Sequence, residues 1–139
     1  MRIDRLRLVN FRQHADTELV LGAGLTGIIG PNGAGKTTLL EAIAWALYGM
    51  PAARGSRETI RRRNAEGRAP VRVELDFTLG PHHFRVERGL NQASLYQDAD
   101  PSPVANSLQA VTEKVSRLLG MTRDEFFNTY FTGQKELAV

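Results

Sequence analysis

The stretch GPNGAGKTT, residues 30–38, decides how the rest of this 139-residue sequence is interpreted. It fits the pattern Gly-x-x-x-x-Gly-Lys-Ser/Thr. An apolar run at 25–29 leads into it, and residues 36–48 carry apolar side chains at helical spacing until glycine and proline follow. A strand, a glycine-rich turn and a helix in this order predict a phosphate-binding loop. The residues that the pattern requires are Gly30, Gly35, Lys36 and Thr37.

The residue types in this loop suit an anion. Glycines let backbone N–H groups curl closely around a phosphate, and the helix that follows points its positive dipole end at it. Lys36 would supply charge to the β- and γ-phosphates, and the Thr37 hydroxyl would bind Mg²⁺. Small-molecule kinases, GTPases, helicases and ABC-type ATPases all use such a loop, so the motif alone leaves the reaction open.

Composition narrows the class of protein. The absence of cysteine excludes disulfides, thiolate zinc sites and cysteine nucleophiles from this chain. No apolar run approaches the roughly 20 residues of a membrane helix, and residues 1–11 do not resemble a secretory signal. We therefore expect a cytoplasmic protein. The net charge of +3 is unevenly spread, because 1–70 hold eleven Lys/Arg against six Asp/Glu and 71–139 hold seven against nine.

Hydrophobic periodicity predicts one compact domain of mixed α and β structure without a linker or repeat. We expect a buried helix at 36–48 because its apolar residues lie on nearly all sides. Thr122 and Glu125 have the spacing of a capping box, which begins a further helix. The other expected elements are strands at 2–10, 17–21, 25–29, 71–79, 83–89 and 93–97, an exposed loop at 50–69 and a helix at 104–119.

A nucleotide hydrolase also needs a second carboxylate for Mg²⁺. The nearest candidate is Asp76, in the strand VRVELD at 71–76. This strand alternates apolar and charged residues, which is typical of a strand with one wet face, so we interpret Asp76 as a surface residue. His14, His82 and His83 fall at turns and are interpreted as solvated. The chain therefore holds half of a hydrolase site.

Two further motifs become informative when they are considered together with the phosphate loop: LVNFRQH at 8–14 and FFNTYFTGQKEL at 126–137. In this order, the three motifs resemble the N-terminal part of the SbcC family, the SMC-like ABC-type ATPases of DNA double-strand-break repair. The resemblance covers essentially the whole chain. It implies an α/β (α+β) fold of the ABC/SMC head type: a P-loop NTPase with N-terminal strands, a buried helix, an antiparallel hairpin and C-terminal helices leading to a coiled-coil base.

In that family the ATPase head is split in sequence. The resemblance implies that residues 1–139 are the N-terminal half of the head, with the coiled coil, signature motif and catalytic glutamate lying elsewhere. It also implies ATP and Mg²⁺ as cofactors. The implied partners are the C-terminal half of the head, a second head in an ATP-dependent dimer, an SbcD-type nuclease subunit and double-stranded DNA, at a cytoplasmic, nucleoid-associated location.

The resemblance assigns roles residue by residue. Lys36 and Gln134 match catalytic positions, since Gln134 matches the glutamine that reaches Mg²⁺ and the attacking water. Thr37 and Gln134 match the metal-binding positions. In the NFRxH turn, Arg12 matches an arginine near the nucleotide, and Gln13 stands where the family often has serine. The expected nucleotide-binding residues are Arg12, Gln13, Asn32, Gly33, Ala34, Gly35, Lys36, Thr37 and Thr38.

Much of the basic excess lies at 54–68, which holds six arginines and two glutamates. Such a loop is either a solvated surface segment or a sequence-independent contact to DNA phosphates. A head that handles DNA ends favours the second interpretation, with Arg61, Arg62 and Arg63 as the expected contacts.

Three hypotheses about the function follow from these motifs. The first is the ATP-binding half of a repair ATPase that dimerises on ATP and gates a nuclease. The second is another SMC-like ATPase, of RecF or chromosome-condensing type, and the third is a small-molecule phosphotransferase. On the first reading the full protein hydrolyses ATP, whereas the isolated 139-residue chain is nearly inactive because it lacks the second carboxylate.

Overall fold

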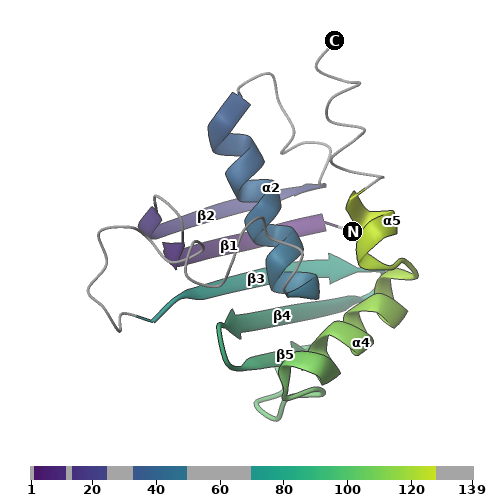
Figure 1. Ribbon diagram of the computed structural model, residues 1–139. Coiled ribbons are helices and arrows are strands. Elements are labelled where there is room, and N and C mark those ends of the chain that lie inside the picture. Colours follow the sequence, from purple (N-terminus) through teal and green to yellow (C-terminus); the bar gives the residue numbers. More distant parts are fainter. Residues whose placement is uncertain (1, 12–13, 25–32, 50–69, 128–139) are drawn as a thin grey trace.

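The computed structural model describes residues 2–11, 14–24, 33–49 and 70–127. Its strands form one five-stranded antiparallel sheet in the order β2-β1-β3-β4-β5 (Figure 1). The strands are β1 Arg2–Phe11, β2 His14–Gly24, β3 Arg72–Leu79, β4 His82–Gly89 and β5 Ala93–Gln97. The helices are α2 Gly33–Tyr48, α4 Leu108–Leu119 and α5 Arg123–Phe127. The predicted mixture of strands and helices is confirmed.

Most strand boundaries fall within a residue or two of the prediction, and 93–97 matches without change. The exception is β2, expected at 17–21 but running over His14–Gly24. It pairs with β1 from Phe11 opposite His14 to Arg2 opposite Gly24. Backbone pairing with a long neighbour therefore extends this strand beyond the stretch that its side-chain alternation indicates. The expected strand at 25–29 and the loop at 50–69 lie outside the described residues.

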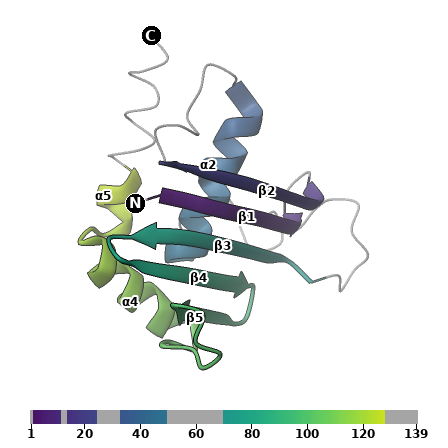
Figure 2. The same cartoon turned by 180° about the vertical axis from the view of Figure 1, so that it is seen from behind.

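The described helices all lie over the same face of the sheet (Figure 1), and the view from behind shows strands in front of them (Figure 2). Helix α2 packs against β1, β3, β4, α4 and α5. From Ala42 to Tyr48 no residue of α2 is more than 3% exposed, which confirms the predicted burial. Among the described residues, no helix is long and apolar enough to cross a membrane.

Helix α4 begins four residues later than expected, at Leu108 instead of Val104. Residues 104 and 105 pair with β5 instead: the Leu95 N–H donates to the Ala105 carbonyl (2.9 Å) and the Val104 N–H to the Leu95 carbonyl (2.7 Å). Ser107 then caps the helix by accepting from the Ala110 N–H at 3.0 Å. The apolar spacing of residues 104–119 could not reveal where the helix begins, because residues in a bridge and residues in a helix can contribute to the same apolar face.

The face of the sheet opposite the helices carries a layer of ion pairs between neighbouring strands, here called the outer-face layer. Glu74 on β3 accepts from Arg5 on β1 at 2.9 Å and forms an ion pair with Arg72 at 2.9 Å. Asp76 pairs with Arg85 on β4 at 2.7 Å and with Arg5 at 3.3 Å. Burial alone would lower the pKa of Arg5, but its hydrogen bonds and charge contacts to the carboxylates raise it above the ordinary value. Asp76 is thus a residue of the outer strand face, as interpreted, and its two ion pairs are a finding of the structure.

The outer-face layer yields a stability prediction. Glu74 is only 6% exposed and pairs with the guanidinium groups of Arg5 and Arg72, so Glu74→Gln removes a buried negative charge on which both converge, although Arg5 keeps Asp76 and Arg72 keeps Glu87. We expect the free energy of unfolding to fall by about 2 kcal/mol, measured by urea denaturation with circular dichroism.

Asp16→Asn is the matched control, because Asp16 pairs with Arg7 at 3.0 Å while its side chain is 56% exposed. Exposed pairs contribute little, so this change should cost less than about 1 kcal/mol. Equal losses for the two variants would contradict the distinction between them.

Candidate nucleotide-binding site

Helix α2 begins inside the phosphate-loop motif. It was expected to start at Lys36, after the last glycine, but its first residue is Gly33, so 33–38 form its first turns. Glycine in a helix interior is costly, whereas in the first turn its N–H has no intrahelical partner to lose. The unpaired amides and the dipole of a helix N-terminus are suited to bind phosphate oxygens. The motif thus stands at the position where a phosphate site requires it.

Several predicted site residues fall where the structure gives no placement. Arg12 and Gln13 form the two-residue connection between β1 and β2, outside the described residues. The neighbouring Phe11 is buried and packs against Trp45 of α2, with ring centroids 5.6 Å apart. Asn32, Gln134 and the arginines at 61–63 also lie outside the described residues, and the side chains at 33–38 are not described.

The histidines of the β3–β4 hairpin behave as predicted. The side chains of His82 and His83 are 49% and 66% exposed. His82 Nδ1 lies 2.7 Å from the Asp98 carboxylate, and His83 Nδ1 lies 2.8 Å from the Thr78 hydroxyl. Hydrogen bonds from the His83 backbone and from His82 hold the pKa of Asp98 below its ordinary value. Within the described part of the chain, no cluster of His, Asp and Glu is arranged to hold a metal ion.

The C-terminal end of α2 combines a predicted residue with one that sequence reasoning missed. Gly49 ends the helix as predicted, at φ 72°, and its N–H donates to the Trp45 carbonyl at 2.7 Å. Arg88 on β4 is only 2% exposed and donates from Nε to the Ala46 carbonyl at 2.9 Å. Burial lowers the pKa of Arg88 to about 10, so the group remains charged at neutral pH. A cation placed on the last carbonyls of a helix complements the negative end of its dipole.

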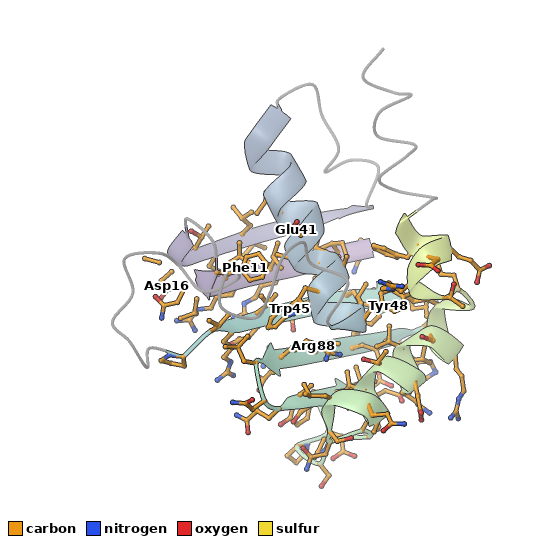
Figure 3. The ribbon with its side chains drawn as sticks, in the orientation of Figure 1. Phe11, Asp16, Glu41, Trp45, Tyr48 and Arg88 are labelled. Atoms are coloured by element: carbon orange, nitrogen blue, oxygen red, sulfur yellow. The ribbon has the colours of Figure 1, made fainter. Side chains whose placement is uncertain are left out.

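Figure 3 shows Trp45, Tyr48 and Arg88 together at this end of α2. The alternation of β4 contained the signal: Phe84 and Val86 face the core, so a residue two positions further along must face it too. That residue is Arg88, and its charge favoured the prediction that it lies on the solvent face of the sheet. The indole N–H of Trp45 is buried and has no hydrogen-bond partner among the described residues.

The predicted capping box is confirmed in front of α5. The Thr122 N–H donates to the Glu125 carboxylate at 2.9 Å, and the Glu125 N–H donates to the Thr122 hydroxyl at 3.2 Å. Phe126 of α5 is fully buried and packs against Tyr48, with ring centroids 5.4 Å apart. The segment that precedes Gln134 in sequence is therefore anchored on the C-terminal end of the helix that carries the phosphate loop.

Comparison with known proteins shows which families this chain is similar to. A family model described as an AAA domain matches residues 5–138. The Rad50 double-strand-break repair ATPase of Methanocaldococcus jannaschii is 32% identical over 142 residues, and that of Thermoplasma acidophilum is 30% identical over 144. These alignments cover 99% of the chain. The replication and repair protein RecF of Brucella abortus is 43% identical over 74 residues, 53% of the chain and 19% of RecF.

The chain belongs to the AAA domain family, since the family model spans nearly all of it. The predicted resemblance to the N-terminal region of SbcC/Rad50-like SMC ATPases is confirmed as well. The chain spans 14–16% of the length of these Rad50 relatives.

The two helix-ending glycines allow a matched test of the C-terminal end of α2. Both have positive φ, 72° at Gly49 and 68° at Gly120. A Cβ at Gly49 would lie 2.6 Å from Arg88 Nη1, whereas at Gly120 nothing lies within 4 Å. We expect Gly120→Ala to cost about 1 kcal/mol of unfolding free energy from backbone strain alone.

Gly49→Ala should cost at least about 1 kcal/mol more, because the new methyl group displaces the buried guanidinium. Thermal and urea unfolding of the two variants would measure the difference. If both variants lost the same stability, Arg88 would not be held as closely as the structure indicates.

Proposed function

We propose that this chain is the ATP-binding N-terminal half of a split ATPase head in an SMC-like DNA repair ATPase. One observation carries the proposal: GPNGAGKTT leads into the first turns of α2 in a chain that is similar over 99% of its length to Rad50 ATPases. The names of these relatives connect the nucleotide site with DNA double-strand-break repair.

In this proposal the triphosphate lies at the N-terminal end of α2. Backbone N–H groups from Asn32 to Thr38 would surround the phosphate oxygens, and Lys36 would neutralise the charge of the β- and γ-phosphates. Arg12 and Gln13 would approach the nucleotide from the β1–β2 connection.

Mg²⁺ would be held mainly by the nucleotide. This ion commonly keeps several waters and takes one or two protein ligands besides substrate phosphates. Thr37 would supply a hydroxyl, and Gln134 would reach the metal and the attacking water.

The remaining partners follow from the same proposal. The chain spans only 14–16% of its Rad50 relatives, which supports a head whose other half lies elsewhere in the protein. ATP would then join two heads, each nucleotide being enclosed by the phosphate loop of one head and the signature motif of the other. Hydrolysis would separate the heads and gate an SbcD-type nuclease subunit.

A RecF-type ATPase is the second candidate, favoured by the higher identity of 43% to RecF. That similarity covers 53% of the chain, whereas the Rad50 similarity covers 99%. Both candidates share the phosphate site. Sequence outside residues 1–139 separates them, because a very long heptad region with a central Cys-x-x-Cys is expected in the first alone.

The nucleotide site is tested by Lys36→Ala. The unmodified chain should bind a fluorescent ATP analogue in the presence of Mg²⁺ and hydrolyse ATP at background rate, since it lacks the second carboxylate. Removing the lysine charge should weaken binding by at least about 100-fold, roughly 3 kcal/mol for a charged hydrogen bond to phosphate.

Lys114→Ala on α4 is the control, because it removes the same charge far from the motif in sequence and should leave binding unchanged. Unaltered binding by the Lys36 variant would contradict the nucleotide site. Rapid turnover by the unmodified chain alone would contradict the half-head interpretation.

The Arg-rich segment at 54–68 is proposed to contact DNA phosphates. Changing Arg61, Arg62 and Arg63 together to Glu should weaken binding to duplex DNA and flatten the plot of log affinity against log salt. Each lost phosphate contact should reduce the slope by about 0.9. Fluorescence anisotropy between 50 and 200 mM salt, roughly the range over which such contacts are titrated, measures this. An unchanged slope would refute the contact.

A further inference from the structure

The C-terminal end of α2 is joined to three other parts of the chain by hydrogen bonds of its last residues. Arg88 comes from β4, Thr112 from α4 and Met121 from the connection between α4 and α5. These three residues and Tyr48 of α2 are called the α2 joint below. The phosphate-loop motif stands at the opposite end of the same helix.

The hydrogen bonds of the α2 joint form a chain through one hydroxyl group. Arg88 Nη2 donates to Thr112 Oγ1 at 3.1 Å, and Thr112 Oγ1 donates to the Tyr48 carbonyl at 3.2 Å. The same guanidinium donates from Nε to the Ala46 carbonyl. Thr112 thus accepts one hydrogen bond and donates another, so Arg88 and Thr112 together tie β4 and α4 to two carbonyls that the helix itself leaves unpaired.

The Tyr48 side chain makes the second connection. Its hydroxyl donates to the Met121 carbonyl at 3.0 Å, and its ring packs against Phe126 of α5. These contacts fix α2 relative to the segment that continues toward Gln134.

A cavity of about 400 Å³ adjoins the joint and is lined in part by Trp45, Tyr48, Arg88 and Thr112. Beside a cavity, side chains have fewer neighbours to oppose a shift, so the directional hydrogen bonds carry more of the positioning.

A helix transmits such a shift to its other end. The 16 residues of α2 extend over about 24 Å at 1.5 Å per residue, and the buried part of the helix runs from Glu41 to its C-terminal residue Tyr48. Because the helix is held in its C-terminal half, a small tilt there displaces its N-terminal end. A displacement of about 1 Å can be costly where several groups must meet one phosphate.

We propose that Arg88, Thr112 and Tyr48 are positioning residues for the nucleotide site, acting through α2 from the end opposite the phosphate loop. This inference rests on the proposed nucleotide binding and adds residues that the phosphate-loop motif does not contain. A joint with only a structural role would alter stability and leave the affinity of the folded protein for nucleotide unchanged.

Thr112 offers a matched pair of variants for the test. Thr112→Val keeps the shape of the side chain but removes the hydroxyl, and Thr112→Ser keeps the hydroxyl. Affinity for a fluorescent ATP analogue with Mg²⁺ is measured in the 139-residue chain at a temperature where circular dichroism shows each variant fully folded. We expect the valine variant to bind at least about 5-fold more weakly and the serine variant to bind within about 2-fold of the unmodified chain.

Tyr48→Phe provides a second test in case the valine variant does not fold, since it removes the hydroxyl that donates to the Met121 carbonyl. It should also weaken binding, by about 3-fold or more. Tyr96→Phe on β5 is its control, because no hydrogen bond of the Tyr96 hydroxyl is found among the described residues, and it should leave affinity unchanged.

The outcomes separate the two proposals. Failure of the unmodified chain to bind nucleotide would overturn the proposed function and the joint with it. Normal binding by the unmodified chain, with equal affinity in the Thr112→Val and Tyr48→Phe variants despite lowered melting temperatures, would overturn the positioning role alone.

Discussion

The burial of α2 against one face of the sheet is the interaction on which the rest of this structure depends. From Ala42 to Tyr48 the helix is enclosed, and Trp45 packs against Phe11 at the end of β1. Apolar burial contributes about 25 cal/mol per Å² removed from water, so this helix stabilises the fold more than any surface contact can. Because GAGKTT occupies its first turns, the same burial also sets the direction in which the phosphate loop points.

Because the helices cover one face of the sheet, the side chains of the opposite face are left toward water. Alternate residues of β1, β3 and β4 must face water, and they are arginines paired with carboxylates on neighbouring strands. The outer-face arginines Arg5, Arg7, Arg72 and Arg85 each pair with at least one acidic side chain. This face therefore presents balanced charge. The proposed DNA contact accordingly rests on the segment at 54–68, whose arginines far outnumber its acids.

Prediction from the sequence succeeded where one local signal dominated. The strict alternation at 71–79 predicted β3, the capping-box spacing predicted the start of α5, and Gly120 closes α4 as its position indicates. It failed where pairing with a distant segment competed with a local pattern. Val104 belongs to a helical stripe in the sequence but bridges β5 in the structure, and β2 extends as far as its pairing with β1 allows.

The residues of the candidate site and its surroundings also fall into two groups, those predicted from the sequence and those found only in the structure. The sequence alone determined the phosphate-loop motif, its family and the alternation of core and surface residues, because these depend on residue types at fixed spacing along one segment. Only the tertiary structure decided that a charged residue, Arg88, is buried under α2, that Thr112 and Tyr48 connect three elements there, and that Asp76 meets two arginines. The physical reason is that each of these contacts joins residues from separate strands or helices, whose distance in space does not follow from their distance in the chain.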